Sequence, residues 1–179
     1  ILHVMDMTRF PYRMKAVPVP SCQVMEDVVF SDDGKTWYLT CMGSSAVVMG
    51  DAATDTPTKT VTAPSGPAFI KYPHGISIHG GIDRLMITST VRPSDLGDPG
   101  ETVTVLEAST GKVLSTHKVS LKPSPSGEAP VETMFLPGAN PPVAYVTNMY
   151  GGTLWMAAWN PTNKSFDFSQ VDDLGKRGQ

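Results

Sequence analysis

The chain repeats one pattern of short apolar strands and tight turns three times. The copies begin near Glu26, His74 and Glu132, so that 48 residues separate the first two starts and 58 separate the next two. Each copy contains two hairpins, and Asp, Asn, Gly and Thr residues occupy the turns. Repetition of this kind identifies an architecture of stacked units, because one such unit alone cannot bury its apolar face. The chain is therefore expected to form a series of small sheets.

Four-stranded units of about 50 residues are typical of β-propeller blades. The expected fold is all-β, with blades over residues 24–64, 74–120 and 131–175 and the last two strands of an earlier blade over residues 1–20. A β-sandwich also has short strands at regular spacing, but it does not predict equivalent hairpins at this period. We therefore favour the β-propeller.

The number of blades constrains how the ring can close. About three and a half blades cannot form a propeller, which needs four or more, and an open set leaves unpaired strand edges. We expect residues 1–179 to be a partial propeller domain from a ring that is seven-bladed. The remainder of the propeller, as missing sequence or as other chains, is then a partner of these residues.

Composition excludes several classes of protein. The chain is 40% hydrophobic and 17% charged, with a mean hydropathy of −0.10, which excludes a disordered tail. A net charge of −3 argues against a nucleic-acid partner. No apolar run reaches the roughly 20 residues of a membrane span. The expected partner is a small molecule or a protein, bound at the loop face of the propeller.

The chain has two cysteines, Cys22 and Cys41, which can form one disulfide or remain free. Their spacing does not match a zinc-binding pair. If the hairpin pairs Val28–Phe30 with Trp37–Leu39, Cys41 lies near Glu26 and out of register with Cys22. This register favours free thiols over a disulfide.

Residues at the start of the innermost strands are candidates for a metal site. Glu26, His74 and Glu132 are interpreted as equivalent positions in successive blades, where they would surround the central channel. Two carboxylates and one imidazole can hold a divalent or first-row transition metal. The alternative is that these polar side chains line a water-filled channel or form buried hydrogen bonds.

The segment 91–101 is a long insertion between two strands of one blade. Insertions of this length are often functional, and Arg92 is a candidate for binding an anionic substrate. Asp95, Asp98 and Glu101 could instead bind calcium, although their spacing does not match an EF-hand. A plain surface loop is the simplest interpretation.

Two groups of large apolar residues are expected in the core. Trp155 and Trp159 are four residues apart and therefore lie on one face of a strand. Met5, Met7 and Met14 lie on adjacent strands and are interpreted as residues that fill gaps in the core.

Two short motifs resemble those of the YVTN family of bacterial propellers. They are Tyr145-Val146-Thr147-Asn148 and Pro73-His74-Gly75-Ile76. This resemblance implies a non-catalytic binding or scaffold module of the cell envelope. It favours a periplasmic or extracellular location over a cytoplasmic one.

Three other segments resemble the selenium-binding protein family, which includes the copper-dependent methanethiol oxidase. They are Pro130-Val131-Glu132-Thr133-Met134-Phe135-Leu136, Leu85-Met86-Ile87-Thr88-Ser89-Thr90 and Leu39-Thr40-Cys41-Met42-Gly43. That resemblance implies an oxidoreductase with copper or another transition metal in the channel and a small, sulfur-containing substrate. The family also has a Pro-His-x-x-His-Cys stretch with the histidines associated with copper. This chain reads Met25-Glu26-Asp27-Val28-Val29-Phe30 there.

Overall fold

The computed structural model describes residues 1–175 as antiparallel sheets whose strands follow one another in chain order. A two-stranded sheet comes first, with β1 (Leu2–Asp6) and β2 (Arg13–Val17). The first four-stranded sheet contains β3 (Met25–Phe30), β4 (Thr36–Cys41), β5 (Ala46–Asp51) and β6 (Thr56–Thr62). The second contains β7 (Pro73–His79), β8 (Arg84–Ser89), β9 (Thr102–Glu107) and β10 (Val113–Lys118). The third contains β11 (Pro130–Phe135), β12 (Val143–Asn148), β13 (Thr153–Asn160) and β14 (Ser165–Asp173).

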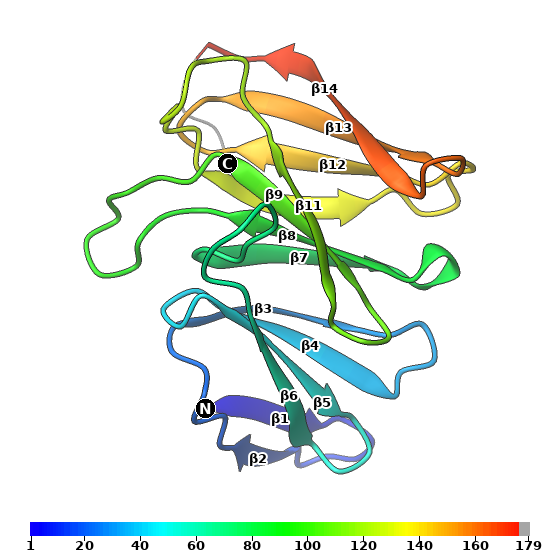
Figure 1. Ribbon diagram of the computed structural model, residues 1–179. Coiled ribbons are helices and arrows are strands. Elements are labelled where there is room, and N and C mark those ends of the chain that lie inside the picture. The colour runs from blue at the N-terminus through cyan, green and yellow to red at the C-terminus, as the bar shows by residue number, and fades with distance from the viewer. Residues whose placement is uncertain (176–179) are drawn as a thin grey trace.

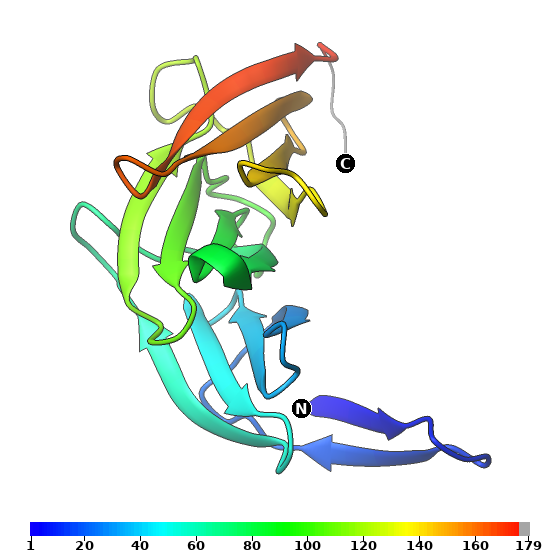
Figure 2. The ribbon, with the colours of Figure 1, turned by 90° about the vertical axis from the view of Figure 1, so that its right-hand side faces the viewer.

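These sheets lie side by side along an arc (Figures 1 and 2). The first strand of each four-stranded sheet is innermost, and β7 packs between β3 and β11. This arrangement of meander sheets around a common axis is that of a β-propeller, so the predicted fold class is confirmed. We call the three sheets the first, second and third blades. The total number of blades in the ring stays a prediction.

Apolar clusters join the blades to one another. Tyr38 and Val47 of the first blade pack against Ile76 and Leu85 of the second. The cluster between the second and third blades contains Trp155, with Trp159 packed against it, as the shared face of these residues predicts. The second blade thus buries one face against the first blade and the opposite face against the third.

The only helical element among residues 1–175 is the 3₁₀ turn η1 (Gly80–Ile82). It joins β7 to β8, and Asp83 ends it in the left-handed conformation at a φ of 55°. A turn at this position is predicted by the Gly80-Gly81 pair. No helix of the described chain is long and apolar enough to cross a membrane.

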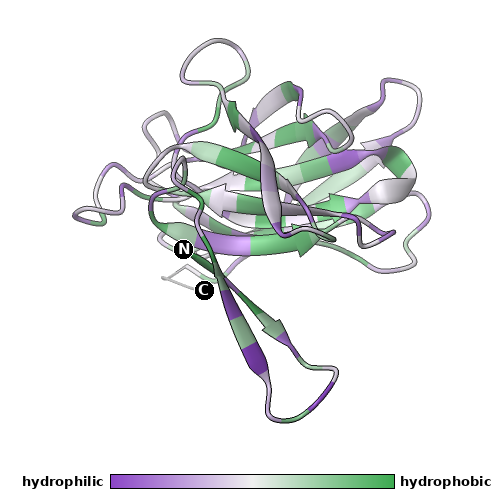
Figure 3. Ribbon diagram, turned by 90° about the horizontal axis from the view of Figure 1, so that it is seen from below, coloured by the Kyte–Doolittle hydropathy of each residue, from purple (hydrophilic) through white to green (hydrophobic). Residues whose placement is uncertain are grey.

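The β1–β2 hairpin projects from the arc (Figures 2 and 3). The prediction that Met5, Met7 and Met14 fill a core is wrong, since their exposed fractions are 51%, 68% and 64%. Leu2, on the opposite face of β1, packs against the cluster around Trp37. The hairpin therefore buries one face on the first blade, and no described sheet covers the other.

Cys22 and Cys41 form a disulfide, which corrects the expectation of free thiols. The sequence argument assumed that the pairing of β3 with β4 continues without interruption. The register instead shifts between Met25 and Val28, and Met25 lies opposite Cys41. The connector before β3 turns back beside this pair, where the two cysteine Cα atoms are 5.1 Å apart.

Candidate metal centre on the inner strands

A bulge near the start of each inner strand places the candidate residues. The register shifts after Met25 in β3, after Pro73 in β7 and after Pro130 in β11. An extra residue in one strand bends it and redirects the side chains that follow. In β3, the backbone N–H of Asp27 donates to Thr40 Oγ1 at 3.0 Å instead of to a strand carbonyl.

His74 lies between two glutamates from different blades. Its Nε2 is 3.6 Å from Glu26 Oε2, and its Nδ1 is 3.6 Å from Glu132 Oε1. The Nδ1 atom is buried and forms no hydrogen bond within residues 1–175. The structure therefore brings together the three residues predicted from the sequence.

Asp27 is a further member of this group that the sequence argument missed. One ligand atom each from Asp27, His74 and Glu132 lie within 4.8 Å of one another. The predicted equivalence of Glu26, His74 and Glu132 is wrong by one residue, because strand pairing aligns Glu132 with Asp27 and Gly75. Pro73 and Pro130 occupy matching positions in β7 and β11 and are 57 residues apart. The predicted match of His74 with Glu132 implied an interval of 58 residues.

A threonine on the next strand accepts a hydrogen bond at each of the three aligned positions. The backbone N–H of Asp27, of Gly75 and of Glu132 each donates to a threonine on the next strand, Thr40, Thr88 and Thr147. These partners are 13, 13 and 15 residues further along the chain. Because the spacing in the third blade is two residues longer, the threonines alone do not align Glu132 with Asp27.

Gly75 holds the position in β7 that Asp27 holds in β3 and Glu132 holds in β11. A Cβ on Gly75 would lie 2.3 Å from the Val131 carbonyl oxygen and 3.1 Å from Glu132 Oε2. The missing side chain lets β11 approach β7 closely and leaves space in which the two carboxylates meet. The group thus depends on a glycine that offers no ligand.

Partial burial of its carboxylate and the negative charge of Asp27 raise the pKa of Glu132, although His74 opposes the shift. A carboxyl whose pKa is higher in the folded state than in the unfolded state stabilises the fold only at low pH. That contribution is lost as the pH rises above 4.5 and through the folded pKa. At neutral pH, the crowded Glu132 carboxylate therefore costs stability.

Glu132→Gln is expected to raise the Tm of the metal-free protein at pH 7, because it removes this repulsion. The rise should not exceed about 2–4 °C, the shift that ~1 kcal/mol produces in a chain of this size. Thermal unfolding in a chelating buffer measures it. A repeat below the pKa of Glu132, where the wild-type carboxyl is protonated, should show no difference. A lower Tm at pH 7 would contradict the expectation.

The donor set fits a divalent first-row metal. One imidazole and two carboxylates converge, and the imidazole nitrogen has no competing hydrogen bond among the described residues. Imidazole suits zinc, copper, iron and nickel, and carboxylates also suit manganese. Glu26 faces the second ring nitrogen of His74, as carboxylates that orient metal-binding histidines do.

Arg92 lies apart from this group, in the loop between β8 and β9. Its guanidinium pairs with Asp95 at 2.8 Å, and its backbone N–H donates to Gly97. Asp98 pairs with Lys71, and Glu101 accepts hydrogen bonds from the connector before β11. The three carboxylates considered for calcium therefore have separate partners, and a role of Arg92 in substrate binding stays a prediction.

No protein-family model and no curated protein matches the chain by sequence. Solved structures match its fold. A hypothetical selenium-binding protein from Sulfolobus tokodaii has a TM-score of 0.71 at 10% identity, over 96% of this chain and 42% of its own. The Pseudomonas aeruginosa periplasmic gluconolactonase has a TM-score of 0.63 at 18% identity, over 91% of this chain and 43% of its own.

An inactive Staphylococcus aureus virginiamycin B lyase with quinupristin has a TM-score of 0.63 at 12% identity, over 96% of this chain and 49% of its own. The chain thus spans less than half the length of these three propellers. The resemblance to the selenium-binding protein family is confirmed at the level of the fold.

Proposed function

We propose that the chain belongs to a metal-dependent β-propeller protein that acts on a small molecule at the mouth of its channel. The cation is held by Asp27, His74 and Glu132, and Glu26 orients the imidazole. The observation that supports this most directly is the cluster of ligand atoms within 4.8 Å. It includes an imidazole whose buried Nδ1 has no hydrogen bond among the described residues.

An oxidase-like reaction with copper or another transition metal is the activity we infer. Its support is the likeness of the fold to the selenium-binding protein from Sulfolobus tokodaii, together with the nitrogen and oxygen donors. Copper(II) binds such donors more tightly than the other divalent first-row metals. A metal held there would polarise a bound substrate, while the carboxylates around it can accept a proton.

The disulfide supports a location outside the cytoplasm. Cys22 and Cys41 are bonded, and disulfides persist mainly in secreted and periplasmic proteins. One propeller of the same fold is a periplasmic gluconolactonase. We infer a periplasmic or extracellular protein.

Metal titration tests the proposed site. Chelator-treated protein should bind one equivalent of Cu²⁺, Zn²⁺ or Mn²⁺ in a calorimeter. Glu26→Gln should weaken binding by about 10–100-fold, as loss of an orienting partner does. His74→Ala removes a ligand and should weaken binding further.

His3→Ala is the matched control, because His3 is exposed on β1 and does not belong to the cluster of ligand atoms from Asp27, His74 and Glu132. Equal losses in His3→Ala and His74→Ala, or no stoichiometric binding of any of the three cations, would overturn the proposal. The non-catalytic binding module would then be favoured. Leu96, which is 62% exposed in the loop braced by Arg92, would be the first contact to test.

A further inference from the structure

The same kind of polar contact occurs at both interfaces between blades. Thr40 Oγ1 of the first blade donates to the His74 carbonyl of the second at 2.6 Å. Thr88 Oγ1 of the second blade donates to the Val131 carbonyl of the third at 2.7 Å. Both threonines are buried, and each also accepts the backbone N–H of its own inner strand. The hydroxyl thereby fixes the register between one blade and the inner strand of the next.

Apolar residues surround this hydroxyl on the face that each blade turns toward the next one, which we call its forward face. In the first blade they are Tyr38, Val47 and Met49, which pack against the second blade. In the second they are Met86, Val103 and Val105, which pack against the third. All six are less than 8% exposed.

The third blade has the same forward face without a neighbour. Strand pairing makes Tyr145, Leu154 and Met156 the counterparts of the six buried residues, and Thr147 the counterpart of the two threonines. The three apolar side chains are only half-buried, and Met134 on the inner strand is 68% exposed.

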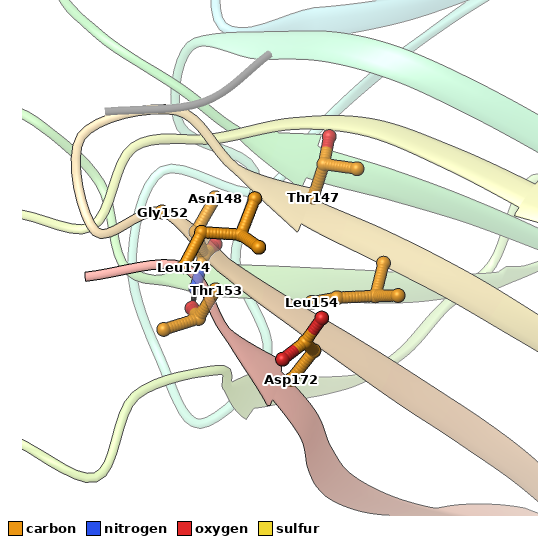
Figure 4. A pocket seen from close by; sticks show the side chains of 7 residues that line it. All are labelled: Thr147, Asn148, Gly152, Thr153, Leu154, Asp172 and Leu174. Carbon is orange, nitrogen blue, oxygen red and sulfur yellow. Dashed lines mark hydrogen bonds between the residues drawn. The ribbon is translucent and has the colours of Figure 1, made fainter. Parts of the chain in front are cut away.

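The hydroxyl of Thr147 also lacks its expected acceptor. It accepts the backbone N–H of Glu132 at 3.3 Å, but it donates to no carbonyl among residues 1–175. Thr147 and Leu154 lie opposite each other on β12 and β13 and line a pocket of about 160 Å³ (Figure 4). The pocket lies where the next inner strand would begin if the spacing of the blades continued.

We propose that the forward face of the third blade receives a further four-stranded blade, whose inner strand offers a backbone carbonyl to Thr147 Oγ1. The argument is continuity, because the same hydroxyl and the same apolar positions form two interfaces within this molecule. The docked strand also covers the side of the metal centre at which Glu132 is 52% exposed.

A second copy of this chain does not fit as the occupant. Its first blade would have to dock through the face that carries Trp37, which is only 2% exposed. Leu2 of β1 and Val19 of the connector already pack against that face. The hairpin β1–β2 therefore blocks the contact that a second copy would need.

Methionine oxidation by peroxide tests the proposal, because the oxidation rate follows exposure. In the isolated 179-residue chain, Met134 should react about tenfold faster than Met86, which is 0% exposed. In the protein isolated at its natural length and composition, Met134 should react as slowly as Met86. Mass spectrometry of both samples in a chelating buffer makes the result independent of bound metal.

Substitutions at Thr147 test the role of the hydroxyl in the natural-length protein. Thr147→Val should restore fast oxidation of Met134, whereas Thr147→Ser keeps the hydroxyl and should keep Met134 protected. Fast oxidation of Met134 in the unmodified natural protein would overturn the proposal. Self-association of the isolated chain with protection of Met134 would also overturn it, by assigning the face to a second copy.

Discussion

Replacement of Gly75 by alanine is expected to lower the free energy of unfolding by about 1–3 kcal/mol, the usual range for overpacking. The new Cβ would lie 2.3 Å from the Val131 carbonyl oxygen and 2.8 Å from Glu132 Cα. Both atoms belong to the backbone of β11, so no side-chain rotation relieves the contact. The inner strands must move apart, and the distance between Asp27 and Glu132 should increase with them.

Urea unfolding measures the loss of stability, and metal titration measures the effect on the site. Gly81→Ala is the matched control, because Gly81 is exposed and its nearest neighbour is the His79 side chain at 3.1 Å. We expect Gly75→Ala to lose both stability and metal affinity and Gly81→Ala to lose little of either. Equal stability of the two variants would show that β7 and β11 are not in close contact at Gly75.

Removal of the disulfide is expected to cost about 2–4 kcal/mol of stability. The bond joins residues 19 positions apart and closes a loop in the unfolded chain. Cys22→Ala combined with Cys41→Ala is the appropriate variant, because both sites are buried and alanine adds no polar group. Thermal unfolding of this variant should show a clearly lower Tm than that of the wild type.

A reducing agent supplies the control for this prediction. Reduced wild-type protein should unfold near the Tm of the double variant, and the reductant should leave the double variant unchanged. An identical Tm for oxidised wild type and double variant would contradict the expected contribution. The metal affinity is also informative, because Cys41 follows Thr40, the residue that fixes Asp27.

Much of the fold could be predicted because its determinants are local. Turns such as Ser31–Lys35 and Ser109–Lys112 are specified by residues that tolerate tight turns. The apolar strands between them recur at a nearly constant interval, and repetition identifies blades. Gly80 and Gly81 likewise mark the turn where η1 forms.

The candidate site could be predicted only in part. His74, Glu26 and Glu132 were found because blade starts converge on a channel. Asp27 was missed, because residues next to each other in a regular strand point to opposite faces. The bulge in β3 removes that restriction and is visible only in the pairing of Met25 with Cys41 and of Val28 with Leu39.

Exposure of the β1–β2 hairpin could not be read from its own residues. Met5 and Met14 lie opposite each other in the pairing and look like core by composition. Whether such a face is buried depends on a sheet that packs against it, and none of the described sheets does. Whether a side chain is buried therefore depends on what packs against it as well as on its own type.

The fold class, the order of the strands and the approximate interval between blades were predictable from the sequence, since these follow from turn residues and apolar patterning within short segments. Which side chains meet was visible only once the strands were paired and the blades packed. The tertiary structure aligned Glu132 with Asp27, bonded Cys22 to Cys41 and left space above Gly75. A shift of one residue moves a side chain to the other face of a strand. Such shifts arise from contacts between segments that lie far apart in the chain.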